Sequence, residues 1–147
     1  MKRTLALFAA MAFVSGAVLA SPAEQEKDTL HVQIARIEKI LIKGFQSDDP
    51  QALRNSTCTL RRLMQLAPNY DWTDCIIPLM HVLNAEEHDP TARVIAAGLL
   101  HVLGTERGDF AISRNAQFSD DLRVRRYCSI LAKARSVEKH KTMAMSR

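Results

Sequence analysis

Apolar side chains recur at intervals of three and four residues along most of the chain, and no run alternates with the period of two that a strand requires. The first such stripe predicts a long helix that is clear from about Asp28 and ends near Gly44 to Gln46. Its members are Leu30, Ile34, Ile37, Leu41 and Phe45. The pattern therefore indicates an all-α protein.

Two Asp-Pro pairs predict the starts of two further helices. The side chains of Asp49 and Asp89 are suited to accept hydrogen bonds from the first amides of a helix, and proline fits the first helical position. The first of these helices should end before Pro68 and the second at Gly104. Their inward positions are Leu53, Thr57, Leu60 and Met64, and Ala96, Leu99, Leu100 and Leu103.

Two more helices complete the pattern. Asp71 opens one that contains Pro78, which removes a hydrogen bond and should bend it, and Asp121 caps the last. Residues 105–121 show a weaker pattern and are expected to form a short helix or a mostly irregular connection. The last helix should fade into a polar tail over residues 136–147. The buried positions are Ile76, Leu79, Met80 and Leu83, and Val124, Cys128, Leu131 and Ala134.

The helices repeat along the chain. When Arg54 is placed on Arg93, at an offset of 39 residues, small or apolar residues coincide at helical spacing. A weaker third copy, with Arg125 on Arg93, follows at an offset of 32. Self-similarity at roughly 30 to 45 residues is typical of α-solenoids, in which helix pairs stack. We therefore predict a short α-solenoid of antiparallel helix pairs, two to three units long, over residues 21–135.

The middle unit carries a helix Ile-Ile-Pro-Leu-Met-His-Val-Leu, an acidic turn, and Asp-Pro-Thr-Ala-Arg before Ala-Ala-Gly-Leu-Leu-His-Val-Leu-Gly. This unit, from Asp71 to Gly104, resembles a HEAT repeat, and the resemblance extends loosely over about residues 28–135. It implies a structural ladder, in which each helix-capping aspartate and an arginine one turn later pair with each other or with the neighbouring repeat. The implied pairs are Asp49 and Arg54, Asp89 and Arg93, and Asp121 and Arg125. The resemblance indicates architecture and says little about activity.

Residues 1–20 have the layout of a secretory signal peptide, with a basic start, an apolar stretch and small residues before the expected cleavage after Ala20. The alternative is an uncleaved membrane anchor, although the apolar run is shorter than the ~20 residues of a stable span. We therefore expect an exported protein, located in the periplasm or secreted.

Charge is unevenly distributed in the remainder. Residues 71–122 hold nine acidic and three basic residues, whereas residues 123–147 hold eight basic residues and one acidic residue. The last helix could therefore contact an acidic protein, an anionic lipid head group or nucleic acid, or be a solvated end cap. Export and the lack of a stacking pattern of aromatic residues argue against nucleic acid. The candidate partner surface is Arg123, Arg126, Lys133 and His140.

The chain contains no recognisable catalytic, metal or cofactor motif. Its five histidines and three cysteines lack the spacing of a zinc site, and neither a phosphate-binding glycine loop nor a nucleophile motif occurs. Cys58 and Cys75 could form a disulfide, but their expected heights on an antiparallel pair differ by ~7.5 Å, more than the ~4.4 to 6.8 Å between disulfide Cα atoms. Free thiols are therefore the expectation.

These observations favour a non-catalytic protein-binding or scaffolding module of the bacterial envelope. One alternative is an enzyme or enzyme accessory with a site in the groove between repeats. Another is peripheral electrostatic attachment to an anionic surface through the last helix. The residues specify neither the partner nor the oligomeric state.

Overall fold

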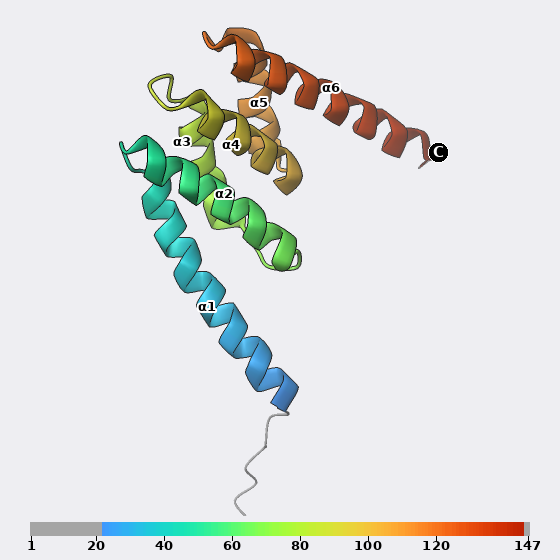
Figure 1. Cartoon of the computed structure of the whole chain (residues 1–147). Coiled ribbons are helices and arrows are strands. Elements are labelled where there is room, and N and C mark those ends of the chain that lie inside the picture. The colour runs from blue at the N-terminus through green and yellow to red at the C-terminus, as the bar shows by residue number, and fades with distance from the viewer. Residues whose placement is uncertain (1–21, 146–147) are drawn as a thin grey trace, which may run out of the picture.

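The computed structural model describes residues 22–145, which form six α-helices and a short 3-10 turn, with no strand among them (Figure 1). The helices are α1 (Pro22–Phe45), α2 (Pro50–Leu66), α3 (Ile76–Asn84), α4 (Pro90–Leu103), α5 (Glu106–Phe118) and α6 (Leu122–Met145). The all-α class is confirmed. The expected signal peptide, residues 1–20, lies outside the described residues. Within that described part, no helix has both the length and the hydropathy needed to cross a membrane.

The helices pack as three antiparallel pairs, α1 with α2, α3 with α4, and α5 with α6, each joined by a short turn (Figure 1). Contacts also connect one pair to the next. Helix α1 contacts α3, which contacts α5, while α2 contacts α4, which contacts α6. One apolar core runs through all three pairs. Its fully enclosed side chains include Leu53, Leu60, Leu79, Leu83, Leu100, Ile112 and Val124.

Three predicted helix termini are confirmed in detail, whereas Asp89 precedes α4 without a side-chain capping hydrogen bond, because its carboxylate accepts from Arg54. The carboxylate of Asp49 accepts hydrogen bonds from the amides of Gln51 and Ala52 at 3.0 and 3.2 Å, and caps α2. The carboxylate of Asp121 caps α6 in the same way, at 2.8 and 3.0 Å from two amides. Gly104 ends α4 with a φ of 66°, a conformation that only glycine adopts readily.

The helix that contains Pro78 begins later than expected, which places this proline in the first turn and not inside the helix. Asp71 accepts a hydrogen bond from the amide of Thr73 as predicted, but the chain then forms the 3-10 turn η1 (Thr73–Cys75) before α3 begins. Pro78 is therefore the third residue of α3. The amides of the first turn have no partner within a helix, so proline there costs no helical hydrogen bond.

Two segments are more helical than expected. Residues 106–118 form the continuous helix α5, in which the hydroxyl of Thr105 accepts a hydrogen bond from the amide of Gly108. The buried face of α5 includes Gly108 and Asn115, which explains its weak apolar pattern. The polar tail expected from Ser136 is instead the end of α6, which continues to Met145 without an intervening glycine or proline.

The inward stripe of α1 differs from the prediction at one position. Ile34, Leu41 and Phe45 are buried as expected, but the side chain of Ile37 is 37% exposed and Glu38 is only 6% exposed. The side chain of Leu30 lies outside those described. Helix α1 therefore presents a carboxylate, and not a fourth apolar side chain, to the rest of the molecule.

Candidate functional site

The outward face of α6 carries the predicted basic surface. Its exposed side chains follow one another at intervals of three and four residues, so that they share a face opposite the buried Val124 and Cys128. Two of them are apolar, Ile130 at 63% and Val137 at 67% exposed. We name the whole set of exposed side chains, basic and apolar, the α6 face. Its members are Arg123, Arg126, Ile130, Lys133, Val137 and Lys141.

The second half of α6 extends past the ends of α4 and α5 in Figure 1. Every side chain described between Ser136 and Met145 is exposed, including Val137 and, at 80%, Met145. The side chain of His140, the fourth residue predicted for this surface, lies outside those described. The α6 face therefore combines positive charge with aliphatic groups on a helix that its own fold covers on one side only.

Helix α1 offers a similar face with a different charge balance. Arg36, Lys39 and Lys43 are exposed there, beside Val32 and Ile40 at 53% and 66% exposed. However, residues 22–45 contain four basic and four acidic residues, whereas residues 123–147 contain eight basic residues and one acidic residue. Of the two terminal helices, α6 has the stronger attraction for an acidic partner.

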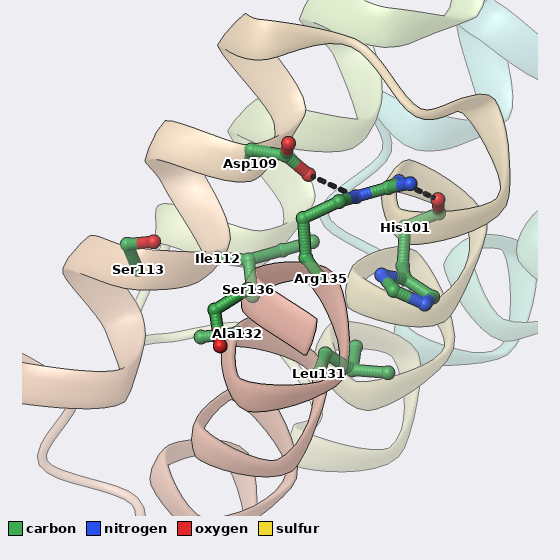
Figure 2. A pocket seen from close by; sticks show the side chains of 8 residues that line it. All are labelled: His101, Asp109, Ile112, Ser113, Leu131, Ala132, Arg135 and Ser136. Carbon is green, nitrogen blue, oxygen red and sulfur yellow. Dashed lines mark hydrogen bonds and ion pairs between the residues drawn. The ribbon is translucent and has the colours of Figure 1, made fainter. Parts of the chain in front are cut away.

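Arg135 fixes α6 to the rest of the fold (Figure 2). Its guanidinium donates to the carboxylate of Asp109 on α5 at 3.0 Å, to the carbonyl oxygen of His101 on α4, and to Glu138 at 3.1 Å. These contacts border a cleft of about 200 Å³ between α4, α5 and α6, which is also lined by Ser113 and Ser136. Arg135 therefore positions α6 and is not part of its free charge.

This cleft contains two serine hydroxyls and a histidine, but the hydrogen bond that joins serine to histidine in a nucleophilic site is not formed in the described part of the chain. Figure 2 shows His101 on one side of Arg135 and Ser113 on the other. Within residues 22–145, the buried Nδ1 atom of His101 has no hydrogen-bond partner, and the hydroxyl of Ser136 donates to the carbonyl of Lys133. Among the described residues, neither serine is hydrogen-bonded to His101. A serine nucleophile requires a base within hydrogen-bond reach.

The implied ladder residues connect successive helix pairs in a way that the sequence did not specify. Arg54 bonds to Asp89 of the next pair, at 3.0 and 3.2 Å, and not to Asp49 of its own pair. At the next step, Arg93 bonds to Asn115 and Ser119, and not to Asp121, whose pKa is lowered mainly by the hydrogen bond from the amide of Val124. Arg125 is exposed.

Arg93 is the largest fully buried side chain, at 2% exposed. Its Nε atom donates to the carbonyl of Leu83 at 3.0 Å, at the end of α3. Its Nη2 atom donates to Asn115 of α5 at 3.4 Å and to Ser119 at 3.1 Å. Arg93 thus joins three helices by satisfying polar groups that would otherwise be buried without partners.

A second buried polar cluster joins α1 to the segment between α2 and α3. Glu38 accepts hydrogen bonds from the hydroxyl of Tyr70 at 2.9 Å and from the thiol of Cys75 at 3.4 Å. Burial is the main cause that raises the pKa of Tyr70 to about 12, and the carboxylate of Glu38 is the second cause. The same two causes raise the pKa of Cys75 well above its usual range. No sequence signal marks this cluster, because its members are 32 and 37 residues apart.

We expect Tyr70→Phe to lower the free energy of unfolding by about 1 to 3 kcal/mol, because the buried carboxylate of Glu38 loses one of its hydrogen bonds. Urea unfolding measures this loss. Tyr127→Phe is the matched control, since within the described residues the Tyr127 hydroxyl makes no hydrogen bond. Equal stabilities of the two variants would contradict a stabilising role for the cluster.

Cys58, Cys75 and Cys128 are free thiols, so the Cys58–Cys75 disulfide is not formed. Cys75 and Cys128 are buried, and burial raises the pKa of Cys128 to about 11, which keeps the thiol protonated and unreactive. No group of three or more His, Cys, Asp or Glu side chains that could hold a metal ion occurs among the described residues.

Comparison with known proteins adds no relative to these observations: no family model, curated protein or solved structure matches the chain.

Proposed function

We propose that this chain is a non-catalytic binding module of the bacterial envelope, built on HEAT-like repeats, which holds an acidic segment of another protein on the α6 face. The proposal has three parts: the repeat architecture, the exported location and the partner surface. The exported location rests on residues 1–20 alone.

The pattern of helix contacts supports the repeat architecture. In a solenoid of helix pairs, the first helix of each pair packs on the first helix of the next, and second helices pack on second helices. The contacts of α1 with α3, α3 with α5, α2 with α4 and α4 with α6 have this order. The bond from Arg54 to Asp89 links the ladder arginine of one pair to the ladder aspartate of the next, as a HEAT-like ladder would.

The α6 face is the observation that carries the partner surface. Its basic side chains are exposed and lie on either side of Ile130 and Val137 along the helix. A partner that covers the exposed methyl groups of these two residues would remove them from water. A purely solvated end cap would place polar side chains at these two positions. Basic and aliphatic groups together fit a segment of protein that mixes carboxylates with apolar side chains.

The proposed function predicts the outcome of removing charge from the α6 face. Replacing Arg123, Arg126 and Lys133 with Gln should weaken capture of envelope proteins by the tagged chain, while the melting temperature stays nearly unchanged, because exposed charges contribute little to stability but much to encounter. Capture by the parent chain should fall as salt rises to physiological strength, where the Debye length is ~8 Å.

The matched control removes three charges from α1. Arg36, Lys39 and Lys43 are also exposed, and their replacement with Gln changes the net charge equally. We expect this variant to capture the same proteins as the parent. Equal losses in both variants would indicate unspecific attraction, and salt-insensitive capture by the α6 variant would place the partner elsewhere. Retention of the chain by anionic lipid vesicles, without protein capture, would favour membrane attachment.

A further inference from the structure

A cleft of about 320 Å³ lies where α2 and α4 end, beside the segment that connects α2 to α3. Helices α2 and α4 are in contact and end on the same side of the molecule in Figure 1. The cleft is separate from the α6 face and from the cleft of Figure 2. Its wall includes Met64, Tyr70, Asp71, Trp72, Val102 and Thr105.

The apolar part of this wall combines aliphatic side chains with two aromatic rings, of which Tyr70 is half-buried and Trp72 is 4% exposed. The ring centroids of Tyr70 and Trp72 lie 4.6 Å apart at an interplanar angle of 58°. Both rings are held from behind, because the Tyr70 hydroxyl donates to Glu38 and the indole Nε1 of Trp72 donates to the carbonyl of Ala67 at 3.3 Å. Rings held in this way give that part of the wall a fixed shape, which is pre-organised for a ligand, and the π-face of an aromatic ring attracts cations.

The charge at the cleft is negative. Asp71 accepts hydrogen bonds from the hydroxyl and the amide of Thr73, which lower its pKa and keep the carboxylate ionised. The carboxyl end of α2, a negative dipole pole, has no basic residue in its last turn. At the end of α4, Arg135 is paired with both Asp109 and Glu138, so that this group adds no net positive charge.

We propose that the cleft between the ends of α2 and α4 binds an organic ammonium group, with Asp71 facing the charge and Tyr70 and Trp72 facing the adjoining carbon atoms. The cleft volume suits a small ligand or one long side chain. The same chemistry is offered by a free amine and by a lysine side chain of a protein. The carboxylate of Asp71 would repel an anion. A neutral apolar ligand would gain no attraction from this carboxylate, so an ammonium group fits the cleft better than either.

Trp72 is the single tryptophan of the chain, so its fluorescence reports on this cleft directly. Titration with n-butylammonium should change the emission of the full chain in a saturable way, whereas 1-butanol, its uncharged analogue, should not. A second titration uses a peptide that contains one lysine, with the same peptide containing norleucine as the uncharged control. This titration shows whether the ammonium group comes from a free amine or from a lysine side chain. Tighter binding of the lysine peptide than of butylammonium assigns the cleft to a protein side chain, and weaker binding assigns it to a free amine.

Asp71→Asn should weaken butylammonium binding about fivefold, the loss expected for a partly exposed ion pair. Asparagine keeps the oxygen that accepts from Thr73, so the local turn is preserved. Asp74→Asn, which removes an exposed acid outside the cleft lining, should leave binding unchanged. Val102→Lys, at a position that is 71% exposed, should abolish binding by placing its own ammonium in the cleft.

Equal responses to butylammonium and 1-butanol, or no saturable response to either, would overturn the proposal. Equal effects of Asp71→Asn and Asp74→Asn would do so as well, since binding would then follow net charge and not this cleft. Melting curves of each variant separate loss of binding from loss of folding.

Discussion

Replacing Arg93 with Ala is expected to lower the free energy of unfolding by about 3 to 5 kcal/mol, the largest effect among the substitutions considered. The side chain is 2% exposed and donates to Leu83, Asn115 and Ser119. Its removal leaves these acceptors buried without a partner and opens a cavity between three helices. Equilibrium unfolding in urea, followed by helical circular dichroism, measures the loss.

Arg54 provides the control for Arg93, because the two residues occupy equivalent positions in successive units of the sequence repeat. Arg54 makes an ion pair with Asp89, but its side chain is 45% exposed. We expect Arg54→Ala to cost less than about 1 kcal/mol, since exposed ion pairs contribute little. If the two alanine variants were equally stable, the buried network around Arg93 would not hold the pairs together.

Leu100→Ala should destabilise the chain by about 2 to 5 kcal/mol. Leu100 is fully enclosed on α4 and packs closely against α5, where a Cβ atom at Gly108 would lie 3.3 Å from the Leu100 Cβ. The close approach of the two helices leaves little room for the site to collapse after truncation. The shift of the urea midpoint at constant slope gives the change in stability.

Val102→Ala tests the same helix on its outer side. Val102 is 71% exposed, so its truncation should change stability by no more than about 0.5 kcal/mol. A loss below about 0.5 kcal/mol for Leu100→Ala would mean that the inward face of α4 is misassigned. The pair of variants thus separates a packing effect from a general effect of alanine substitution in α4.

Local patterns in the sequence predicted the helices well where apolar spacing and capping residues agree. Asp49, Asp121 and Gly104 act through neighbours two to four residues away, so their roles follow from local sequence. Helix α5 was underestimated because its buried face contains Gly108 and Asn115, whose burial depends on α4 and on Arg93. A local pattern contains no information about such contacts.

The polar clusters were not predictable for the same reason. Apolar spacing alone favoured Ile37 over Glu38 on the inward face of α1, since a carboxylate is rarely buried without partners. The partners of Glu38 are Tyr70 and Cys75, which only the packing of α1 on the later segment brings together. The Tyr70 and Trp72 cleft likewise depends on where α2 and α4 end.

The proposed partner surface was predicted from charge, and the structure shows exposed apolar side chains at its centre. The eight basic residues between positions 123 and 147 indicated a surface that attracts acidic partners. The sequence did not show which of these residues are exposed and which are engaged by the rest of the fold. Arg135 is engaged by Asp109 and the carbonyl of His101, whereas Arg123, Arg126 and Lys133 are exposed around Ile130.

Site-specific photo-crosslinking tests the proposed binding module most directly. A photoreactive residue at Val137, in the α6 face, should give an adduct in the envelope fraction whose crosslinked peptide, identified by mass spectrometry, is rich in Asp and Glu. The same residue at Ile77 of α3, which is 49% exposed, should not give this adduct. Adducts at Val137 with lipid alone, or the same protein adduct at both positions, would contradict a partner held on the α6 face.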